Sequence, residues 1–311
     1  MAEALLPLRC EPSPRRRPWA GSRLEGYGLQ TGELWLAGPE SAVTAGPWSG
    51  RSLDEVARAI PERLLGPESR RRLGDRFPIL VKVLDTGDWL SIQVHPDDRA
   101  AVELRGPGSL GKTEAWVVID AAPGAEMVIG PRAEYPEAEL RQGIEAGSID
   151  QYLFQRIECR TGQVMLVPAG TLHSIGPGAF VYEIQQPSDL TFRVFDWDRP
   201  AASDRPLHRL EALHSINPSG RALTVGDVGS LATRPLVTDY FGLEAIALPA
   251  EVVRRPAGAL EVITAIRGAV AASGQGFAER LESLETLVVP ASVPFYELSS
   301  TDDGLVLVGR A

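Results

Sequence analysis

The segment Gly162-x5-Pro168-x-Gly170-x2-His173 decides the fold that we expect. Its apolar residues predict a short strand, and Pro168 and Gly170 predict the tight turn that ends this strand. His173 therefore stands directly after a strand and a turn. Similar short apolar runs, separated by turn residues, fill residues 77 to 195 and recur after residue 235. This pattern predicts a mainly β fold, either a barrel or a sandwich.

Helical spacing interrupts the strands in two places, residues 52 to 75 and residues 134 to 156. We expect inserted helices there, and the first of them should break near Pro61 and Gly66. A further short helix is predicted to follow Pro96 and to end at Arg105.

A faint internal repeat indicates two β modules. The segment Leu284–Ala291 is similar in sequence to Gly162–Ala169, but it lacks the glycine and histidine that follow the first copy. We therefore expect a catalytic domain over residues 1–230, which contains the helical insertions. A C-terminal β module without metal ligands should follow over residues 231–311.

The composition limits the classes of partner. With 311 residues and 44% hydrophobic content, the chain can bury a large core. Its formal net charge of -10 argues against nucleic acid or an anionic membrane as the main partner. The sequence shows no apolar run of signal-peptide or transmembrane length, so we expect a cytoplasmic protein. Cys10 and Cys159 lie outside any CxxC-type pattern and are expected to be free thiols.

Positive charge in this chain is carried almost entirely by arginine. Of the 31 basic residues only Lys82 and Lys112 are lysines. An ammonium is a compact charge that responds strongly to burial, whereas a guanidinium is a permanently charged planar fork. Lysines this rare invite an explanation by position, and an anionic small molecule would need such local positive charge.

Four residues have the spacing and chemistry of a metal site. Gln93 and His95 are two residues apart in an apparent strand, so their side chains share a face. Glu114 opens the next apolar run, and His173 follows the turn described above. Two imidazoles and a carboxylate are donors that zinc accepts, and a fourth donor such as Gln93 suits a metal that polarises a carbonyl. The remaining histidines, which we expect to be surface or packing residues, are His208 and His214.

The chain resembles a known family in four ordered blocks. These blocks are Leu90–Asp98, Gly111–Trp116, Val167–His173 and Tyr182–Arg199. They resemble the type I mannose-6-phosphate isomerases, in their short bacterial form, which belong to the cupin superfamily. The resemblance implies cupin barrels of the double-stranded β-helix type, with inserted helices and two modules of which only the first binds metal. It also implies one zinc ion per chain, held by Gln93, His95, Glu114 and His173.

The same resemblance implies an activity. The expected reaction interconverts mannose 6-phosphate and fructose 6-phosphate through an enediol-type intermediate, with Arg193 in the active site. For proton transfer we rank Glu183 slightly above Lys112, because a carboxylate near a metal can be tuned for this role. Ser91, Lys82 and Lys112 are our candidates for binding the substrate at its phosphate end. The expected partner is thus a small sugar phosphate, and the sequence does not predict an oligomeric state.

Two alternatives remain open at this point. The first is a catalytically silent sugar-phosphate-binding protein that keeps the fold and the metal. The second is an iron cupin oxygenase, although such sites usually rest on a facial triad with open positions for oxygen. A glutamine donor with two lysines nearby favours a phosphorylated sugar over this second alternative.

Overall fold

The computed structural model describes residues 5–149, 151–199, 205–248 and 251–311. The chain divides into two compact units. The first contains Met1–Ser13, Leu34–Lys82 and Asp227–Ala311, and the second contains Pro14–Glu33 and Val83–Gly226. Residues 34–82 thus pack with the C-terminal part of the chain, whereas the sequence analysis counted them in the catalytic domain. The functional division at residue 230 stays a prediction.

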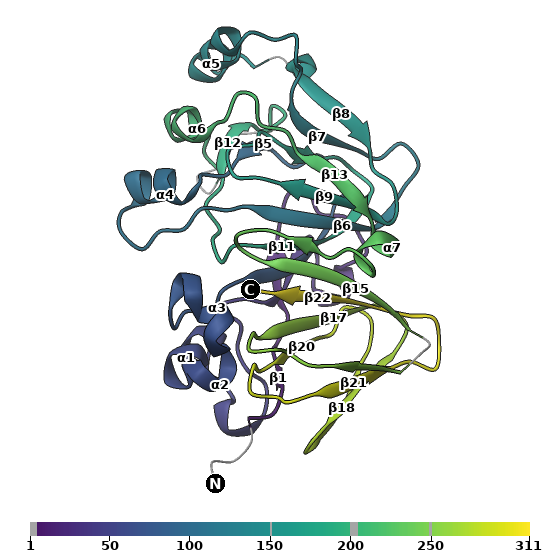
Figure 1. The fold of residues 1–311 in the computed structure, drawn as a ribbon. Coiled ribbons are helices and arrows are strands. Elements are labelled where there is room, and N and C mark those ends of the chain that lie inside the picture. The colour runs from purple at the N-terminus through teal and green to yellow at the C-terminus, as the bar shows by residue number, and fades with distance from the viewer. Residues whose placement is uncertain (1–4, 150, 200–204, 249–250) are drawn as a thin grey trace. The chain divides into compact units, whose positions relative to one another are not determined.

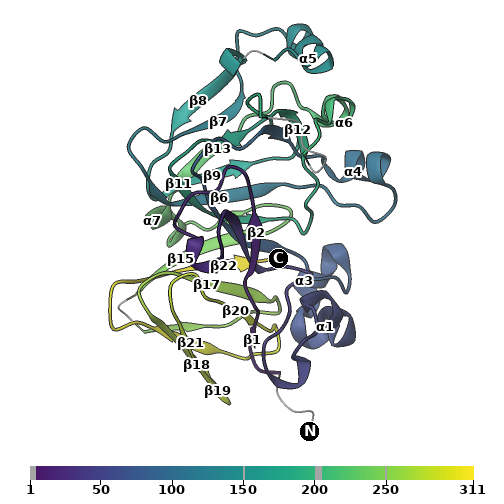
Figure 2. The same ribbon diagram turned by 180° about the vertical axis from the view of Figure 1, so that it is seen from behind.

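The predicted metal ligands lie on or next to strands of three sheets. The largest has seven strands in the order β13 (Leu223–Asp227), β9 (Gln163–Val167), β6 (Glu114–Ala121), β11 (Ala179–Gln185), β4 (Leu80–Asp85), β3 (Thr31–Ala37) and β2 (Ser13–Arg16). A three-stranded sheet has the order β10 (Ser174–Ile175), β7 (Glu126–Pro131) and β8 (Phe154–Glu158). A third sheet pairs β12 (Phe192–Phe195) with β5 (Ile92–Val94). In Figure 1, β6 lies between β9 and β11, and Figure 2 shows the same three strands from behind.

Three helices lie along one side of the second unit in both ribbon views. They are α4 (Asp98–Arg105), α5 (Glu137–Ala146) and α6 (Arg209–Ser215). The Asp97 carboxylate caps α4 by accepting the Ala100 N–H at 2.7 Å, as expected for an acidic residue at this position.

The predicted helix over residues 134–156 is too long. Helix α5 ends at Gly147, which adopts φ 70° and ψ 25°, the left-handed conformation that glycine tolerates best. A 3-10 turn follows at Gln151–Leu153, and residues 154–156 belong to strand β8, which pairs with β7. Tertiary pairing therefore overrides the local helical spacing here.

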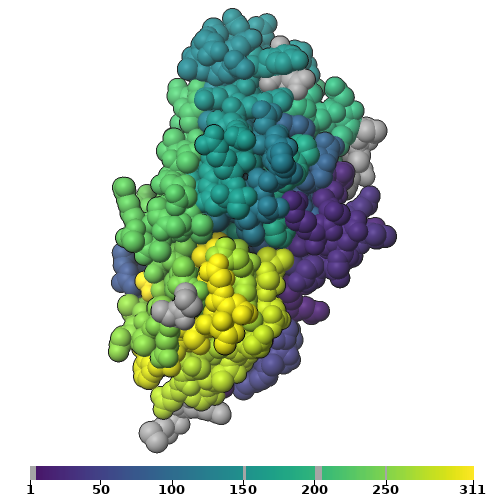
Figure 3. Space-filling model, turned by 90° about the vertical axis from the view of Figure 1, so that its right-hand side faces the viewer, coloured from purple at the N-terminus to yellow at the C-terminus, as the bar shows by residue number. Residues whose placement is uncertain are grey.

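The first unit is also mainly β. A six-stranded sheet has the order β1 (Leu8–Arg9), β20 (Thr286–Val289), β17 (Glu261–Arg267), β22 (Gly304–Arg310), β15 (Gly242–Leu248) and β14 (Leu236–Val237). A four-stranded sheet has the order β16 (Val252–Arg254), β21 (Tyr296–Ser299), β18 (Val270–Gly274) and β19 (Phe277–Leu281). On the face shown in Figure 3, the residues after 250 form one continuous yellow-green to yellow part of the surface.

The helical region predicted over residues 52–75 forms three short helices of the first unit. They are α1 (Leu53–Ala59), α2 (Pro61–Leu64) and α3 (Gly66–Leu73). A further helix of this unit is α7 (Val228–Leu231). Ser52 and Glu55 form a capping box that starts α1. The predicted breaks are confirmed, because α2 begins at Pro61 and α3 begins at Gly66. Short 3-10 turns also occur at Glu25–Tyr27 and Gly46–Trp48.

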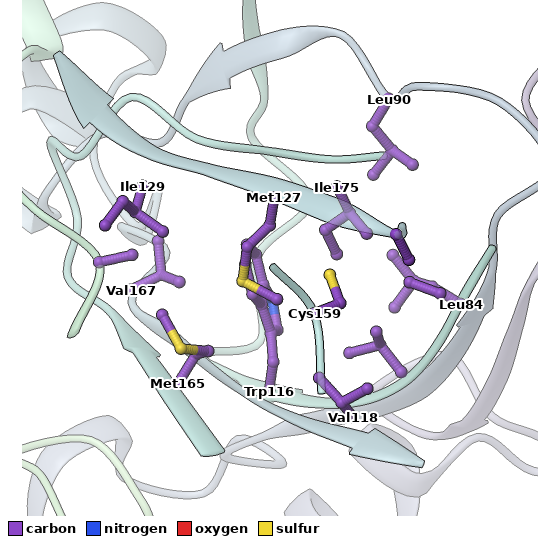
Figure 4. Close-up of a cluster of buried hydrophobic side chains, with 14 of the residues drawn as sticks. Leu84, Leu90, Trp116, Val118, Met127, Ile129, Cys159, Met165, Val167 and Ile175 are labelled. Atoms are coloured by element: carbon purple, nitrogen blue, oxygen red, sulfur yellow. The ribbon is translucent and has the colours of Figure 1, made fainter. Parts of the chain in front are cut away.

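Each unit has its own hydrophobic core. In the second unit, Trp116, Met127 and Met165 point toward one another between the strands, as Figure 4 shows. In the first unit a separate cluster is built from residues of β15, β17, β20 and β22, among others. Both segments of the internal repeat form strands, β9 and β20, each within one of these cores. The two-module organisation is compatible with this arrangement and stays a prediction.

The cysteines are free thiols, as predicted. Burial raises the pKa of both Cys10 and Cys159 to about 12, so both are protonated at neutral pH. Among the described residues, no helix is long and apolar enough to cross a membrane.

Candidate metal centre and active site

Strand pairing brings the sequence-distant ligand candidates together. Gln93 lies on β5, and Glu114 is the first residue of β6. Gln93 and His173 form an isolated antiparallel bridge, with N–H to carbonyl distances of 3.1 and 3.0 Å. His95 directly follows β5, and His173 directly precedes β10. The three short segments therefore meet at one point of the second unit.

The two histidines and the glutamate form a compact, buried cluster. The possible ligand atoms of His95, Glu114 and His173 all lie within 4.8 Å of one another. Each histidine Nε2 is 3.4 Å from one carboxylate oxygen of Glu114. All three side chains are about 1% exposed. Across the described ranges, no other group of three histidine, cysteine or acidic residues comes this close together.

Backbone carbonyls fix the direction of both imidazoles. His95 Nδ1 lies 2.8 Å from the carbonyl oxygen of Leu190, and His173 Nδ1 lies 2.9 Å from that of Thr171. A carbonyl can only accept, so each Nδ1 carries the proton and donates it. Each Nε2 is then unprotonated, and its lone pair is available to a donor or a metal ion. Burial, together with the charge of Lys112, lowers the pKa of His95 to about 3, which keeps this imidazole neutral at physiological pH.

Gln93 completes the cluster with a side-chain amide. Its Nε2 is 3.3 Å from His173 Nε2, and its Oε1 accepts the Ser91 hydroxyl at 3.2 Å. The Ser91 hydroxyl can donate or accept, so rotating the amide by half a turn keeps a hydrogen bond to Ser91. In that orientation the amide oxygen faces His173 and can act as a neutral donor to a metal.

Lys112 places one ammonium between two carboxylates. Its Nζ lies 2.6 Å from Glu114 Oε2 and 3.3 Å from Glu183 Oε1. The same nitrogen is 3.0 Å from His95 Nε2. Burial alone would raise the pKa of Glu114, but Lys112 and the histidines outweigh it and hold this pKa well below its ordinary value. Glu114 is therefore an ionised, buried carboxylate.

Arg193 faces the same side of the β5–β12 pair as Gln93. The two residues are direct partners across the strands, and such partners project to the same face. The Arg193 Nε is buried and has no hydrogen-bond partner among the described atoms. Burial, with the nearby Arg205, lowers the pKa of Arg193 from its ordinary value, although a guanidinium stays charged at neutral pH. A buried donor without a partner beside the cluster suits contact with an anionic ligand.

Comparisons with known proteins match this arrangement. Residues 28–109 match the model of the phosphomannose isomerase type I catalytic domain. A mannose-6-phosphate isomerase of Streptococcus mutans is 42% identical over 232 residues, covering 71% of this chain and 68% of the relative. The chain belongs to the type I mannose-6-phosphate isomerase family.

A second relative and a solved structure agree with this family membership. A mannose-6-phosphate isomerase of Bacillus subtilis is 37% identical over 226 residues, which is 68% of each chain. A crystal structure of the mannose 6-phosphate isomerase from Bacillus subtilis superposes with a TM-score of 0.82 at 28% identity, covering 98% of this chain and 99% of that one. The mainly β fold with inserted helices is thus the cupin fold of this family, as predicted.

The remaining candidate residues lie at different places. Ser91 precedes β5 and contacts Gln93, as described above. Lys82 lies on β4 with a buried side chain, and its role in substrate binding stays a prediction. His208 is not part of the metal cluster. Its Nδ1 accepts the backbone N–H of Arg193 at 3.2 Å, so it packs against the backbone of that residue.

The groups that orient the two candidate histidine ligands are backbone carbonyls, which the sequence does not reveal. Every residue has a backbone carbonyl, so the side chains of Leu190 and Thr171 do not indicate that their carbonyls bind the histidines. Only the folded chain shows this. Trp116 was noted only as part of a family block, yet its ring packs edge-on against His173 with centroids 5.5 Å apart. Its position two residues after Glu114 on one strand was the available signal, because such residues share a face.

Proposed function

We propose that this protein is a zinc-dependent isomerase that interconverts mannose 6-phosphate and fructose 6-phosphate. Family membership supports the reaction and the substrate. The observation that supports a bound metal is the buried cluster of His95, Glu114 and His173, whose donor atoms lie within 4.8 Å of one another. Gln93 is the proposed fourth protein donor.

The donor set suits zinc. Zinc binds imidazole nitrogen and carboxylate oxygen, and its histidine ligands commonly donate the other ring N–H to a carbonyl. Both His95 and His173 do so. Lys112 contacts Glu183 as well as Glu114, so it can give up its contacts within the cluster to a metal ion and remain paired. When bound, zinc would supply a Lewis acid that polarises the sugar carbonyl.

Side chains of this protein are proposed to transfer the proton and to stabilise the negative charge that develops on the substrate. In our proposal Glu183 takes the proton from the carbon beside the carbonyl and returns it to the former carbonyl carbon. The hydroxyl proton on the first carbon moves to the former carbonyl oxygen, so that an enediol-type intermediate forms and is then consumed. Lys112, 3.3 Å from Glu183, is the alternative for this role. Arg193 stabilises the negative charge that develops on the substrate oxygen. Ser91, Lys82 and Lys112 are proposed to bind the phosphate end.

Metal removal tests the proposed function. We expect the purified protein to contain about one zinc ion per chain and to isomerise mannose 6-phosphate without any need for oxygen. Dialysis against a chelator should abolish turnover, and added zinc should restore it. Zinc-bound but inactive protein would support the silent sugar-phosphate-binding alternative. Turnover that requires iron and oxygen would support the oxygenase alternative.

Replacement of Arg193 separates metal binding from catalysis. We expect Arg193→Ala to keep its zinc and to lose about 100-fold in kcat, as is typical when one charged group that stabilises a transition state is removed. Zinc content by atomic emission and steady-state kinetics provide the measurement. Arg99→Ala is the matched control, because that side chain is 84% exposed on α4 and pairs with its helix neighbour Glu103. Near-wild-type turnover of the Arg193 variant would exclude the catalytic role.

A further inference from the structure

Gln186 links the segments that carry the metal-ligand candidates without contacting the cluster itself. This residue directly follows β11, and its side chain is 2% exposed. Its Oε1 accepts the backbone N–H of Thr113 at 2.9 Å, and its own backbone N–H donates to the Thr113 carbonyl at 3.1 Å. Thr113 lies between Lys112 and Glu114. Gln186 therefore fixes the residue that separates the active-site ammonium from the carboxylate.

The other end of the Gln186 amide reaches helix α4. Gln186 Nε2 donates to Asp98 Oδ1 at 2.9 Å, and the Gly111 N–H donates to the same oxygen at 2.9 Å. Asp98 is three residues after His95. A Cβ on Gly111 would lie only 2.6 Å from the Asp98 backbone nitrogen, so the two backbones are in direct contact. The amide thus connects the His95 segment to the Lys112–Glu114 segment.

Thr113 extends this connection to the third ligand segment. Its hydroxyl accepts the Ala169 N–H at 3.1 Å, four residues before His173. The Gly170 N–H in turn donates to the His95 carbonyl at 2.8 Å. The three ligand segments are therefore joined in a closed set of hydrogen bonds. Within this set, the side-chain amide of Gln186 bonds to two segments, through its oxygen to Thr113 and through its nitrogen to Asp98.

We propose that Gln186 is a positioning residue that sets the place of Glu114 and Lys112 relative to His95. This inference deepens the proposed metal site and rests on it. An amide suits the position because Thr113 presents a donor and Asp98 presents an acceptor. Glutamine offers both an acceptor and a donor, whereas an ionised glutamate of the same length can only accept. Losing a group that hydrogen-bonds a metal ligand directly typically costs 10- to 100-fold in metal affinity or activity. Gln186 acts through Thr113 and Asp98, so we expect the lower end of this range.

Gln186→Met tests the proposal, because methionine keeps the length of the side chain and removes both side-chain hydrogen bonds. We expect zinc affinity, measured by competition with a chromophoric chelator, to fall about 10-fold. We also expect kcat to fall about 10-fold, with KM changing less than about 2-fold. Gln186→Glu should behave similarly, because its carboxylate would face Asp98 Oδ1 in place of a donor.

A second readout depends on neither zinc nor turnover. The chain has two lysines, so lysine labelled with carbon-13 at Cε gives two NMR signals, which Lys82→Arg assigns. Gln186→Met should move the Lys112 signal in metal-free protein and leave the Lys82 signal in place. A failure of the isomerase assay alone would count against the proposed function, whereas an unmoved Lys112 signal would overturn the positioning role.

Thr86→Val is the matched control for loss of a buried hydrogen-bonded group. The Thr86 hydroxyl donates to the Gly176 carbonyl at 2.7 Å and accepts the Ala179 N–H at 2.9 Å. Ala179 begins β11 and Gln185 ends it, so this control lies roughly 20 Å from Gln186 at ~3.3 Å per residue. It should lower the thermal midpoint while zinc affinity and the Lys112 signal stay unchanged. Equal losses of zinc affinity in both variants would show that Gln186 contributes stability only.

Discussion

Replacing Glu114 with glutamine is expected to reduce turnover by about 1,000-fold, which corresponds to roughly 4 kcal/mol in the activation free energy. Glu114 is the one anionic member of the ligand cluster, and its two oxygens each face one histidine at 3.4 Å. A neutral amide removes the charge that attracts a divalent cation. It also leaves Glu183 as the carboxylate that pairs with Lys112. Zinc affinity should fall by at least about 100-fold, because a ligand itself contributes more than its outer partners do.

Zinc competition and steady-state kinetics on the same preparation check this expectation. The matched control is Glu103→Gln on α4, which removes an exposed carboxylate that pairs with Arg99 and His214. This control should keep both zinc and turnover. If Glu114→Gln bound zinc as tightly as the unsubstituted protein, the assignment of Glu114 as a metal ligand would be wrong.

The second large effect concerns a buried ion network in the first unit. Arg254 is 8% exposed and binds Glu244 with both terminal nitrogens, at 3.1 and 3.0 Å. It also donates to Glu261 at 2.9 Å, and Glu261 is fully buried. Tyr296 and Arg310 contact Glu261 as well. Burial would raise the pKa of Glu261, but Arg254 outweighs it, so this carboxylate stays ionised within the core.

Arg254→Met is therefore expected to lower the free energy of unfolding by about 3 kcal/mol. Removing one partner of a buried pair typically costs 3 to 5 kcal/mol, and we take the lower end because Arg310 remains beside Glu261. Denaturant unfolding followed by circular dichroism measures the change. Arg267→Met is the matched control on the same unit, since its pair with Asp303 is exposed and should contribute less than about 1 kcal/mol. Equal effects of the two substitutions would contradict a dominant role for the buried network.

Much of the metal cluster could be predicted from the sequence, because its signals are local. Gln93 and His95 share a face through the two-residue period of a strand, and His173 follows a strand and a glycine turn. These features depend on neighbouring residues only. Folding adds the long-range pairing, in which the Gln93–His173 bridge places two residues 80 positions apart in direct contact.

Local patterns failed where distant pairing competes with them. Residues 154–156 have helical spacing but form the start of β8, because pairing with β7 satisfies their backbone groups. In the same way, no sequence pattern assigned residues 34–82 to one compact unit with residues 227–311. That grouping depends on side chains that meet only after the chain has folded.

The sequence by itself determined the mainly β fold, the ligand candidates and the family, because strand period, turn residues and ordered motif blocks are properties of short segments. The tertiary structure alone decided how the ligands are oriented. Leu190 and Thr171 act through backbone carbonyls, which every residue possesses, so nothing in their side chains marks them. Gln186 likewise gains its proposed role from the distance between its amide and two other segments. Such roles depend on contacts between residues that are far apart in the sequence. A pattern within a short segment cannot show these contacts.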